Sequence, residues 1–278
     1  MFDLSKPQVG IAGVAPYAVI YGQAGIGKTT FAAMPPNTVI ADVEKGIPER
    51  LRAIPRFPVN TMQELVGMLQ ALGQQRHTWT HLLVDSASAL TANMTSDICR
   101  EQKWLLPDGR NDMGERGYGA YGRGERIVGE RWALIVSEIQ KLKEQRNIAI
   151  TLTAHVRIAK VRPPDVDEYA RYDLALPAQA IEVVTQRADV VGFMSYPVVT
   201  VKDAGKQHGV AKAIGETDAR LYLRSAATHH AKNRFELPEN IIIPAGNPAA
   251  GFAQYARNIP FFAPLFQQQP AQAQQLVQ

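Results

Sequence analysis

The sequence predicts an α/β fold with a mostly parallel central sheet and helices on both of its faces. Short apolar runs that are typical of buried strands recur along the chain, and segments with helical patterns separate them. Strands that alternate with helices are joined by crossover connections, which place the strands parallel in one sheet. A length of 278 residues and an apolar content of 46% are sufficient for one large domain or two small ones.

Each predicted element follows from a local pattern. Apolar runs predict strands at 17–22, 37–44, 80–85, 148–156 and 188–196. Helical patterns predict helices at 61–73, 86–104 and about 127–145, and a short helix after residue 29 that ends at Pro35-Pro36. A hairpin is expected within 219–243, and the aperiodic segments 105–126 and 157–178 are expected to be long loops.

The composition limits the environment and the partners of the chain. A net charge of +4 and a pI of about 9.1 permit an anionic partner without requiring one. Cys99 is the only cysteine, so no internal disulfide can form, which favours a reducing compartment. The first ten residues lack a signal-peptide pattern, and no apolar run approaches the roughly 20 residues that span a bilayer. We therefore expect a cytoplasmic location and no membrane partner.

The end of the chain differs in composition from the rest. We expect one domain over residues 1–258, followed by an apolar segment and a Gln-rich tail at 259–278. The apolar stretch "IPFFAPLF" either packs on the core of its own chain or docks on a neighbouring subunit, and the sequence leaves both possibilities open. The Gln/Ala-rich tail cannot bury enough apolar area to become ordered.

A glycine-rich loop directly follows the first predicted strand. Residues 22–29, GQAGIGKT, match the pattern G-x-x-x-x-G-K-[ST] without a gap, and a chance match is expected only roughly once in a hundred chains of this composition. The glycines let backbone N–H groups turn inward around phosphates, the lysine reaches the terminal phosphates, and the threonine hydroxyl binds Mg²⁺. The predicted nucleotide-binding residues are Gly22, Gln23, Ala24, Gly25, Ile26, Gly27, Lys28, Thr29 and Thr30.

Two carboxylates are candidates for the chemistry beside this loop. Asp85 ends the predicted strand "HLLVD" and is expected to hold Mg²⁺ together with Thr29, although a helix N-cap role is an alternative for this position. Glu44 ends the strand that follows the loop, on the sheet edge where ligands of open α/β sheets bind. We expect Glu44 to orient or deprotonate the attacking water, the alternative being a solvated loop glutamate.

These motifs together resemble the RecA-like P-loop ATPases over roughly residues 15–245. "VDSASAL" (84–90) is similar to the metal-binding strand of that family, and "IADVEKG" is similar to the element that carries its catalytic glutamate. The resemblance makes His155, in "LTAHVR", the polar sensor at the end of the fourth strand. It also makes Lys232 and Arg234, in "AKNRFELPE", a finger that reaches the ATP of a neighbouring subunit, whereas a basic hairpin facing solvent is the alternative.

The resemblance also implies a function and partners. A core of this length without accessory domains is most similar to phage-encoded RecA-like recombinases and single-strand annealing ATPases, by analogy and not through any one motif. It implies an ATPase that uses ATP and Mg²⁺, forms a homo-oligomeric ring or filament on single-stranded DNA, and promotes annealing or strand exchange. A single-strand-binding protein is a further candidate partner, and a phage protein would act in the host cytoplasm. The alternatives are a helicase-type motor or loader, and a small-molecule P-loop kinase.

RecA-like proteins bind DNA through two loops, and the two segments expected to be loops occupy the corresponding positions. The expected contacts are basic side chains for phosphates and tyrosines that stack on bases, each stack being worth about 1–3 kcal/mol. Acidic residues dilute both segments, so a surface loop of balanced charge is the alternative. The predicted DNA-binding residues are Arg110, Arg116, Tyr118, Tyr121, Arg123 and Arg126 in the first segment, and Arg157, Lys160 and Arg162 in the second.

Overall fold

A ten-stranded sheet forms the centre of the molecule in a computed structural model, which describes residues 13–201, 212–215 and 217–264. The strand order is β12-β10-β7-β1-β5-β4-β2-β3, with β6 added to β5 and β11 to β7. The strands are β1 (Tyr17–Gly22), β2 (Thr38–Asp42), β3 (Arg56–Pro58), β4 (His81–Asp85), β5 (Ala149–Val161), β6 (Tyr169–Leu174), β7 (Val190–Ser195), β10 (Ala219–Tyr222), β11 (Lys232–Asn233) and β12 (Asn240–Ile243). A separate two-stranded sheet joins β8 (Val198–Val201) to β9 (Lys212–Gly215).

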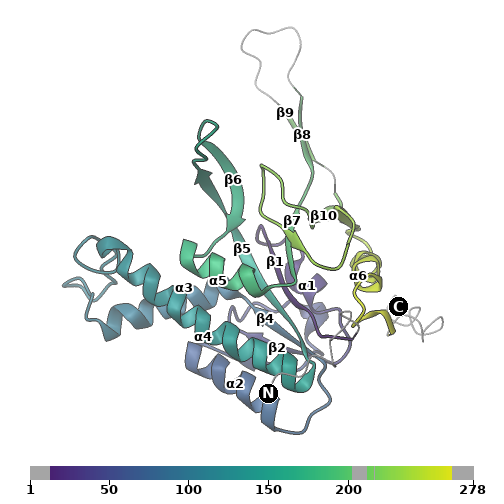
Figure 1. Cartoon of the computed structure of the whole chain (residues 1–278), viewed down its shortest axis with the longest axis horizontal. Coiled ribbons are helices and arrows are strands. Elements are labelled where there is room, and N and C mark those ends of the chain that lie inside the picture. Colours follow the sequence, from purple (N-terminus) through teal and green to yellow (C-terminus); the bar gives the residue numbers. More distant parts are fainter. Residues whose placement is uncertain (1–12, 202–211, 216, 265–278) are drawn as a thin grey trace, which may run out of the picture.

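Helices cover both faces of the large sheet (Figure 1). One face carries α2 (Met62–Gln74), α3 (Ala87–Glu101), α4 (Arg123–Arg146) and α5 (Ala178–Arg187), and the other carries α1 (Lys28–Ala32) and α6 (Pro248–Arg257). Two short 3₁₀ turns are η1 (Glu49–Leu51) and η2 (Ala120–Gly122). The predicted α/β class is therefore confirmed. No helix in the described ranges combines the length and the apolarity that crossing a bilayer requires.

The register of the parallel strands fixes one functional edge. Strands β1 to β5 and β7 run parallel, so their carboxyl ends meet on the same side of the sheet. Gly22, at the end of β1, pairs with His155 in β5 and with Met194 in β7, and Asp42 pairs with Asp85. β10 pairs antiparallel with both β7 and β12, which confirms the antiparallel pairing predicted within 219–243.

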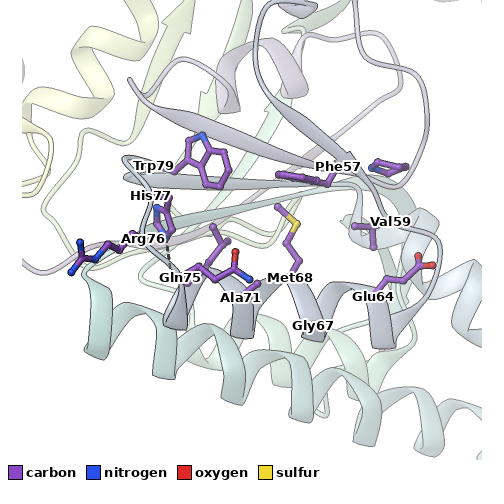
Figure 2. Close-up of a pocket in the computed structure, with 12 residues that line it drawn as sticks. Phe57, Val59, Glu64, Gly67, Met68, Ala71, Gln75, Arg76, His77 and Trp79 are labelled. Atoms are coloured by element: carbon purple, nitrogen blue, oxygen red, sulfur yellow. Dashed lines mark hydrogen bonds between the residues drawn. The ribbon is translucent and has the colours of Figure 1, made fainter.

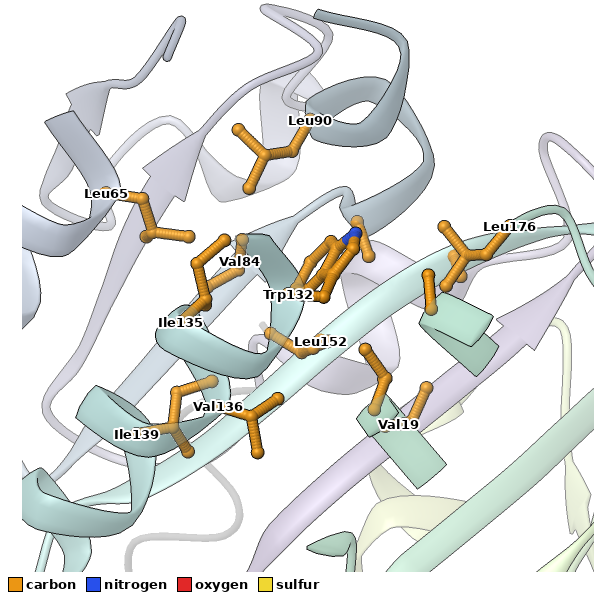
Figure 3. Packing of buried hydrophobic residues seen from close by; sticks show 14 of the residues in the cluster. Val19, Leu65, Val84, Leu90, Trp132, Ile135, Val136, Ile139, Leu152 and Leu176 are labelled. Carbon is orange, nitrogen blue, oxygen red and sulfur yellow. The ribbon is translucent and has the colours of Figure 1, made fainter. Parts of the chain in front are cut away.

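The larger core lies between the sheet and helices α2 to α5. Trp132 of α4 is fully buried among side chains of α2, α3 and the strands, as Figure 3 shows. Its indole Nε1 donates a hydrogen bond to Thr91 Oγ1 at 2.9 Å, so the polar atom of the ring is satisfied. Helix α4 buries Val128, Trp132, Ile135 and Ile139 at helical spacing, which explains why the amphipathic pattern at 127–145 predicted it. The helix begins four residues earlier, at Arg123.

The second core contains the residues after position 258 that the structure describes. Ile259 and Phe262 are buried in a cluster with Phe252 of α6 and Phe31 of α1. Of the two possibilities for this apolar segment, its first residues therefore pack on the core of their own chain. The residues from 265 onward, including the Gln-rich tail, lie outside the described residues.

The prediction of a long loop over residues 157–178 is wrong for most of that segment. β5 continues to Val161 and pairs antiparallel with β6, forming a hairpin that extends past the end of β1 (Figure 1). Val156 and Ile158 are alternating apolar positions in "HVRIAKV", a strand pattern that the following prolines and acidic residues obscure. Helices α5 and α6 were not predicted; α5 begins after Pro177 without a side-chain cap, so the usual start signal is missing.

Candidate active site

The glycine-rich loop follows β1 and depends on glycine at specific positions. A Cβ on Gly22 would lie 2.2 Å from the carbonyl oxygen of Met194, so any larger residue would push β1 away from β7. Gly25 and Gly27 have φ values of +76° and +100°, in the left-handed region that favours glycine. The glycines of the predicted motif therefore permit both the close approach of the strands and the tight curvature of the loop.

Lys28 directs its ammonium group back into this loop. Its Nζ donates to the carbonyl oxygens of Gly22, at 3.1 Å, and Gln23, at 2.8 Å. Burial lowers the pKa of Lys28, whereas the nearby carboxylates of Glu44 and Asp85 act in the opposite direction. The loop thus holds a cation at its centre, where a phosphate would find an opposite charge.

Asp85 lies at the end of β4 and contacts a hydroxyl on each side. Its Oδ2 accepts a hydrogen bond from Thr29 Oγ1 at 2.9 Å, and its Oδ1 accepts one from Thr153 Oγ1 of β5. Burial raises the pKa of Asp85, and the two hydroxyl hydrogen bonds oppose that shift. Thr153 is fully buried and was not predicted from the sequence. The signal that could have identified it is a polar residue within the apolar run "AITLTA".

The Thr29 and Asp85 oxygens fit a Mg²⁺ site. Hydroxyl and carboxylate oxygens are the ligands that this cation prefers, and it usually keeps water and substrate phosphates as its other ligands. The described part of the chain contains no group of three or more His, Cys, Asp or Glu side chains placed to hold a metal by themselves. The donor set therefore suits a cation that is bound together with a phosphate ligand.

Glu44 and His155 are brought together although they are far apart in the sequence. The backbone N–H groups of Val43 and Glu44 donate to the carbonyl oxygen of Asp85, at 2.8 and 3.1 Å, which places Glu44 beside the end of β4. Glu44 Oε1 lies 3.0 Å from His155 Nε2 and also accepts a hydrogen bond from the hydroxyl of Ser86. Glu44 is therefore held in place by two side chains and is not a freely solvated loop residue.

Ser86 and Ser88 connect this site to helix α3. Ser86 is the N-cap of α3, and its Oγ accepts a hydrogen bond from the backbone of Ala89 at 3.3 Å. Ser88 Oγ accepts a hydrogen bond from the backbone N–H of His155 at 2.9 Å. The N-cap of α3 is therefore Ser86 and not Asp85, and the carboxylate of Asp85 faces Thr29.

Lys232 and Arg234 lie at the opposite edge of the sheet. β11 pairs with the beginning of β7, where Lys232 Nζ donates to the carbonyl oxygens of Thr185 and Gln186 at 3.1 and 2.8 Å. A guanidinium nitrogen of Arg234 lies 3.3 Å from Asp189 Oδ1. The two residues do not reach the glycine-rich loop of their own chain. Their predicted action on a neighbouring subunit is not tested by a single chain and stays a prediction.

The predicted DNA-binding residues fall into three groups. The first pairs with acidic neighbours: Arg110 with Asp108, Arg126 with Glu130, and both Lys160 and Arg162 with Glu168. The second is exposed: Arg116, Tyr121, Arg123 and Arg157. The third is Tyr118 alone, which is 6% exposed and packs against Gly124 in the core. The expectation that Tyr118 stacks on a base is wrong for this conformation, because the residue is buried in the core.

A hollow lies at the far end of the sheet, and none of the predicted site residues line it. It has a volume of about 430 Å³ and lies between β3 and α2, where Trp79 and Met68 line it (Figure 2). Three strands separate β3 from β1 in the sheet order, so this hollow is not part of the glycine-rich loop.

The first strand of the parallel sheet ends in a glycine-rich loop that contains a buried lysine. A threonine–aspartate pair and a glutamate fixed by two side chains lie beside this loop. This arrangement defines a P-loop nucleoside triphosphatase. A comparison with known families agrees with this class. Residues 15–235, most of the chain, match the AAA domain family, and the chain belongs to that family of P-loop ATPases. A search of curated proteins returned no match. The match supports nucleotide binding and hydrolysis, whereas the narrower resemblance to phage recombinases stays a prediction.

Proposed function

We propose that this chain is a Mg²⁺-dependent ATPase that assembles on single-stranded DNA and couples hydrolysis to annealing or strand exchange. The observation that carries the proposal is the path of β5. Within this one strand, Thr153 contacts Asp85 and His155 contacts Glu44, and Arg157 follows two residues later on the projecting hairpin. A polyanion that moves the hairpin would therefore shift both the predicted metal ligand Asp85 and the predicted catalytic residue Glu44.

Each side chain of the site has a role in hydrolysis under this proposal. Lys28 neutralises the terminal phosphates, and Thr29 with Asp85 would hold Mg²⁺, which withdraws charge from the phosphate oxygens when bound. Glu44 orients the attacking water and accepts its proton. His155 and Ser86 hold the Glu44 carboxylate, so a change in the contact with His155 changes how well that water is aligned.

Single-stranded DNA would contact the exposed cations near this edge. Arg157 on the hairpin and Arg116 and Arg123 around the start of α4 are exposed and can bind phosphates without reading sequence. Lys160 and Arg162 share one carboxylate, that of Glu168, so this pair keeps an excess of positive charge. Affinity should therefore fall steeply with salt.

Assembly would complete the site. Charge builds on the transferred phosphate oxygens in the transition state, and a cation supplied by a neighbouring subunit stabilises it. Lys232 and Arg234 are the candidates for that cation, and both would have to leave the contacts that they make with their own chain. Turnover would then depend on protein concentration and on the DNA that gathers the subunits.

The test is the ATP turnover rate with and without single-stranded DNA, with particle imaging of both samples. We expect DNA to raise the rate and to induce rings or filaments, and Arg157→Glu to lower the ratio of stimulated to unstimulated rate. Equal rates with and without DNA, together with no self-association, would refute the proposal. Phosphoryl transfer from ATP to a small metabolite would favour the kinase alternative, and directional unwinding would favour the motor.

A further inference from the structure

An aromatic pocket of about 380 Å³ lies directly beside the glycine-rich loop. Four segments that are distant in the sequence form its walls: the glycine-rich loop, β6 of the hairpin, the end of β7, and the β10 strand with the loop that follows it. The side chains that matter here are Gln23, Tyr172, Phe193, Tyr196, Tyr222 and His229. Gln23 is one of the predicted nucleotide-binding residues, and none of the others belongs to the predicted catalytic, nucleotide-binding or DNA-binding residues.

The inner wall of the aromatic pocket is a rigid stack of rings. Phe193 is buried at its centre, with the ring of Tyr172 at 5.2 Å and 22° and the ring of His229 at 5.3 Å and 27°. Tyr222 adds a fourth ring, 5.0 Å from His229. Stacked rings of this kind are held by their neighbours and lose little conformational freedom when a further planar group is added.

The outer wall offers open aromatic surface. Tyr172 and Tyr196 are 38% and 39% exposed, although both line the pocket. Gln23 is exposed on the side of the glycine-rich loop and carries an amide that can both donate and accept hydrogen bonds. The pocket thus combines stacking faces with polar groups at its rim, which suits a flat ring with polar edges better than an aliphatic side chain.

Hydrogen bonds tie the pocket to both functional parts of the protein. The backbone N–H of Tyr172 donates to the carbonyl oxygen of Thr228 at 2.8 Å, which joins the hairpin to the loop after β10. Tyr21, the residue before the glycine-rich loop, donates its hydroxyl to the carbonyl oxygen of His230 at 2.7 Å. A ligand in the aromatic pocket would therefore contact the hairpin and the nucleotide loop at once.

We propose that the aromatic pocket holds an unpaired nucleobase of the DNA strand that the hairpin binds. This inference rests on the proposed function, because it assigns a base-binding site to the same DNA. The aromatic pocket suits the stacking of any nucleobase, and both single-stranded DNA and the adenine of ATP are sources of one. The DNA strand is favoured as the source because only Gln23 comes from the nucleotide loop, whereas Tyr172 belongs to the hairpin and the other walls come from β7 and β10.

The test compares two variants with a matched control. Tyr196→Ala removes an exposed ring of the outer wall, and Tyr172→Phe keeps the stack on Phe193 but removes the hydroxyl group. Phe57→Ala, at the β3 edge, removes a ring that is similarly exposed, at 46%, and lies outside the pocket. Thermal unfolding establishes that each variant is folded.

Binding is measured with a thymine oligonucleotide that contains one 2-aminopurine, whose fluorescence falls when the base stacks on a ring. We expect Tyr196→Ala to weaken DNA binding by about 5- to 150-fold, the range for losing one stacked base, and to reduce the quenching. Tyr172→Phe and Phe57→Ala should both retain the quenching. The KM for ATP, measured in parallel, should be unchanged in all three variants.

The possible outcomes distinguish a base of DNA from the adenine of ATP, and they distinguish failure of this inference from failure of the proposed function. A raised KM for ATP with unchanged DNA affinity in Tyr196→Ala would assign the pocket to adenine and overturn this inference. Wild-type binding and quenching in folded Tyr196→Ala would overturn it as well, while leaving the proposed function intact. If the wild-type protein itself does not bind the oligonucleotide, the proposed function fails and the pocket inference fails with it.

Discussion

His81 gives the most quantitative prediction, because both of its ring nitrogens are used inside the fold. It is fully buried at the start of β4, with Nδ1 2.9 Å from Thr38 Oγ1 and Nε2 2.9 Å from Thr151 Oγ1. Burial lowers the pKa of His81 to about 3, so the folded protein keeps this ring neutral. A protonated ring would place an unpaired charge in the core, and the unfolded chain is the state that takes up the proton.

The direction and the size of the pH effect follow from these two states. The unfolded chain binds the proton near its ordinary pKa of about 6.5, whereas the folded chain does not bind it until about pH 3. Stability is therefore fully present above about pH 6.5 and falls as the pH decreases below it. Each pH unit in this window contributes ~1.4 kcal/mol, so His81 should lower the free energy of unfolding by about 2 kcal/mol between pH 7 and pH 5.

Urea denaturation at pH 7, 6 and 5 measures this contribution. We expect the His81→Asn variant to be less stable at every pH, and subtracting its free energy of unfolding from that of the wild type cancels the other titrating groups. The difference should shrink by about 2 kcal/mol from pH 7 to pH 5. His77→Asn, which removes a histidine stacked on Trp79, should retain the wild-type loss. A constant difference between the wild type and His81→Asn would refute the reasoning.

The remaining predictions concern the active site. Lys28→Ala should lower ATP turnover by at least about 100-fold, because it removes the cation at the phosphates; unchanged hydrolysis would refute the site. Thr153→Val removes a hydrogen bond to the buried aspartate, worth about 1.5–3 kcal/mol, and should raise the Mg²⁺ concentration needed for half-maximal turnover, whereas Thr151→Val on the same strand should not. Glu44→Gln should bind ATP without hydrolysing it, as equilibrium binding and turnover assays will show. Mixing this variant with Arg234→Ala should recover turnover if the arginine acts between subunits, and a mixture as inactive as its components would count against that role.

Several parts of the site could be predicted from the sequence because they are encoded locally. The loop at 22–29 depends on backbone conformations that glycine adopts most easily, and that requirement is visible in the residues themselves. Strands β1 and β4 coincide with the apolar runs at 17–22 and 80–85 to within one residue. Asp85 could be placed at the functional edge because the end of a parallel strand is a position that periodicity identifies.

What could not be predicted depends on contacts between distant segments. Tyr118 lies in a glycine-rich and arginine-rich segment that suggested exposure, yet it is buried because Gly124 leaves room for its ring. The stretch after His155 was expected to be a loop because its prolines and charges hid an alternating pattern, and only pairing with β6 makes it a strand. Arg234 was predicted as a cation for a neighbouring subunit, but where its guanidinium lies in the single chain depends on the register of β11 against β7.

The sequence by itself determined the class of the protein and predicted the nucleotide loop and the two carboxylates beside it, since turn chemistry and periodicity act over a few residues. The tertiary structure decided which side chains meet, above all the contact between Glu44 and His155, which are 111 residues apart. Such a contact depends on the strand order and register of the whole sheet, which many small packing and hydrogen-bond energies fix together and no local pattern specifies.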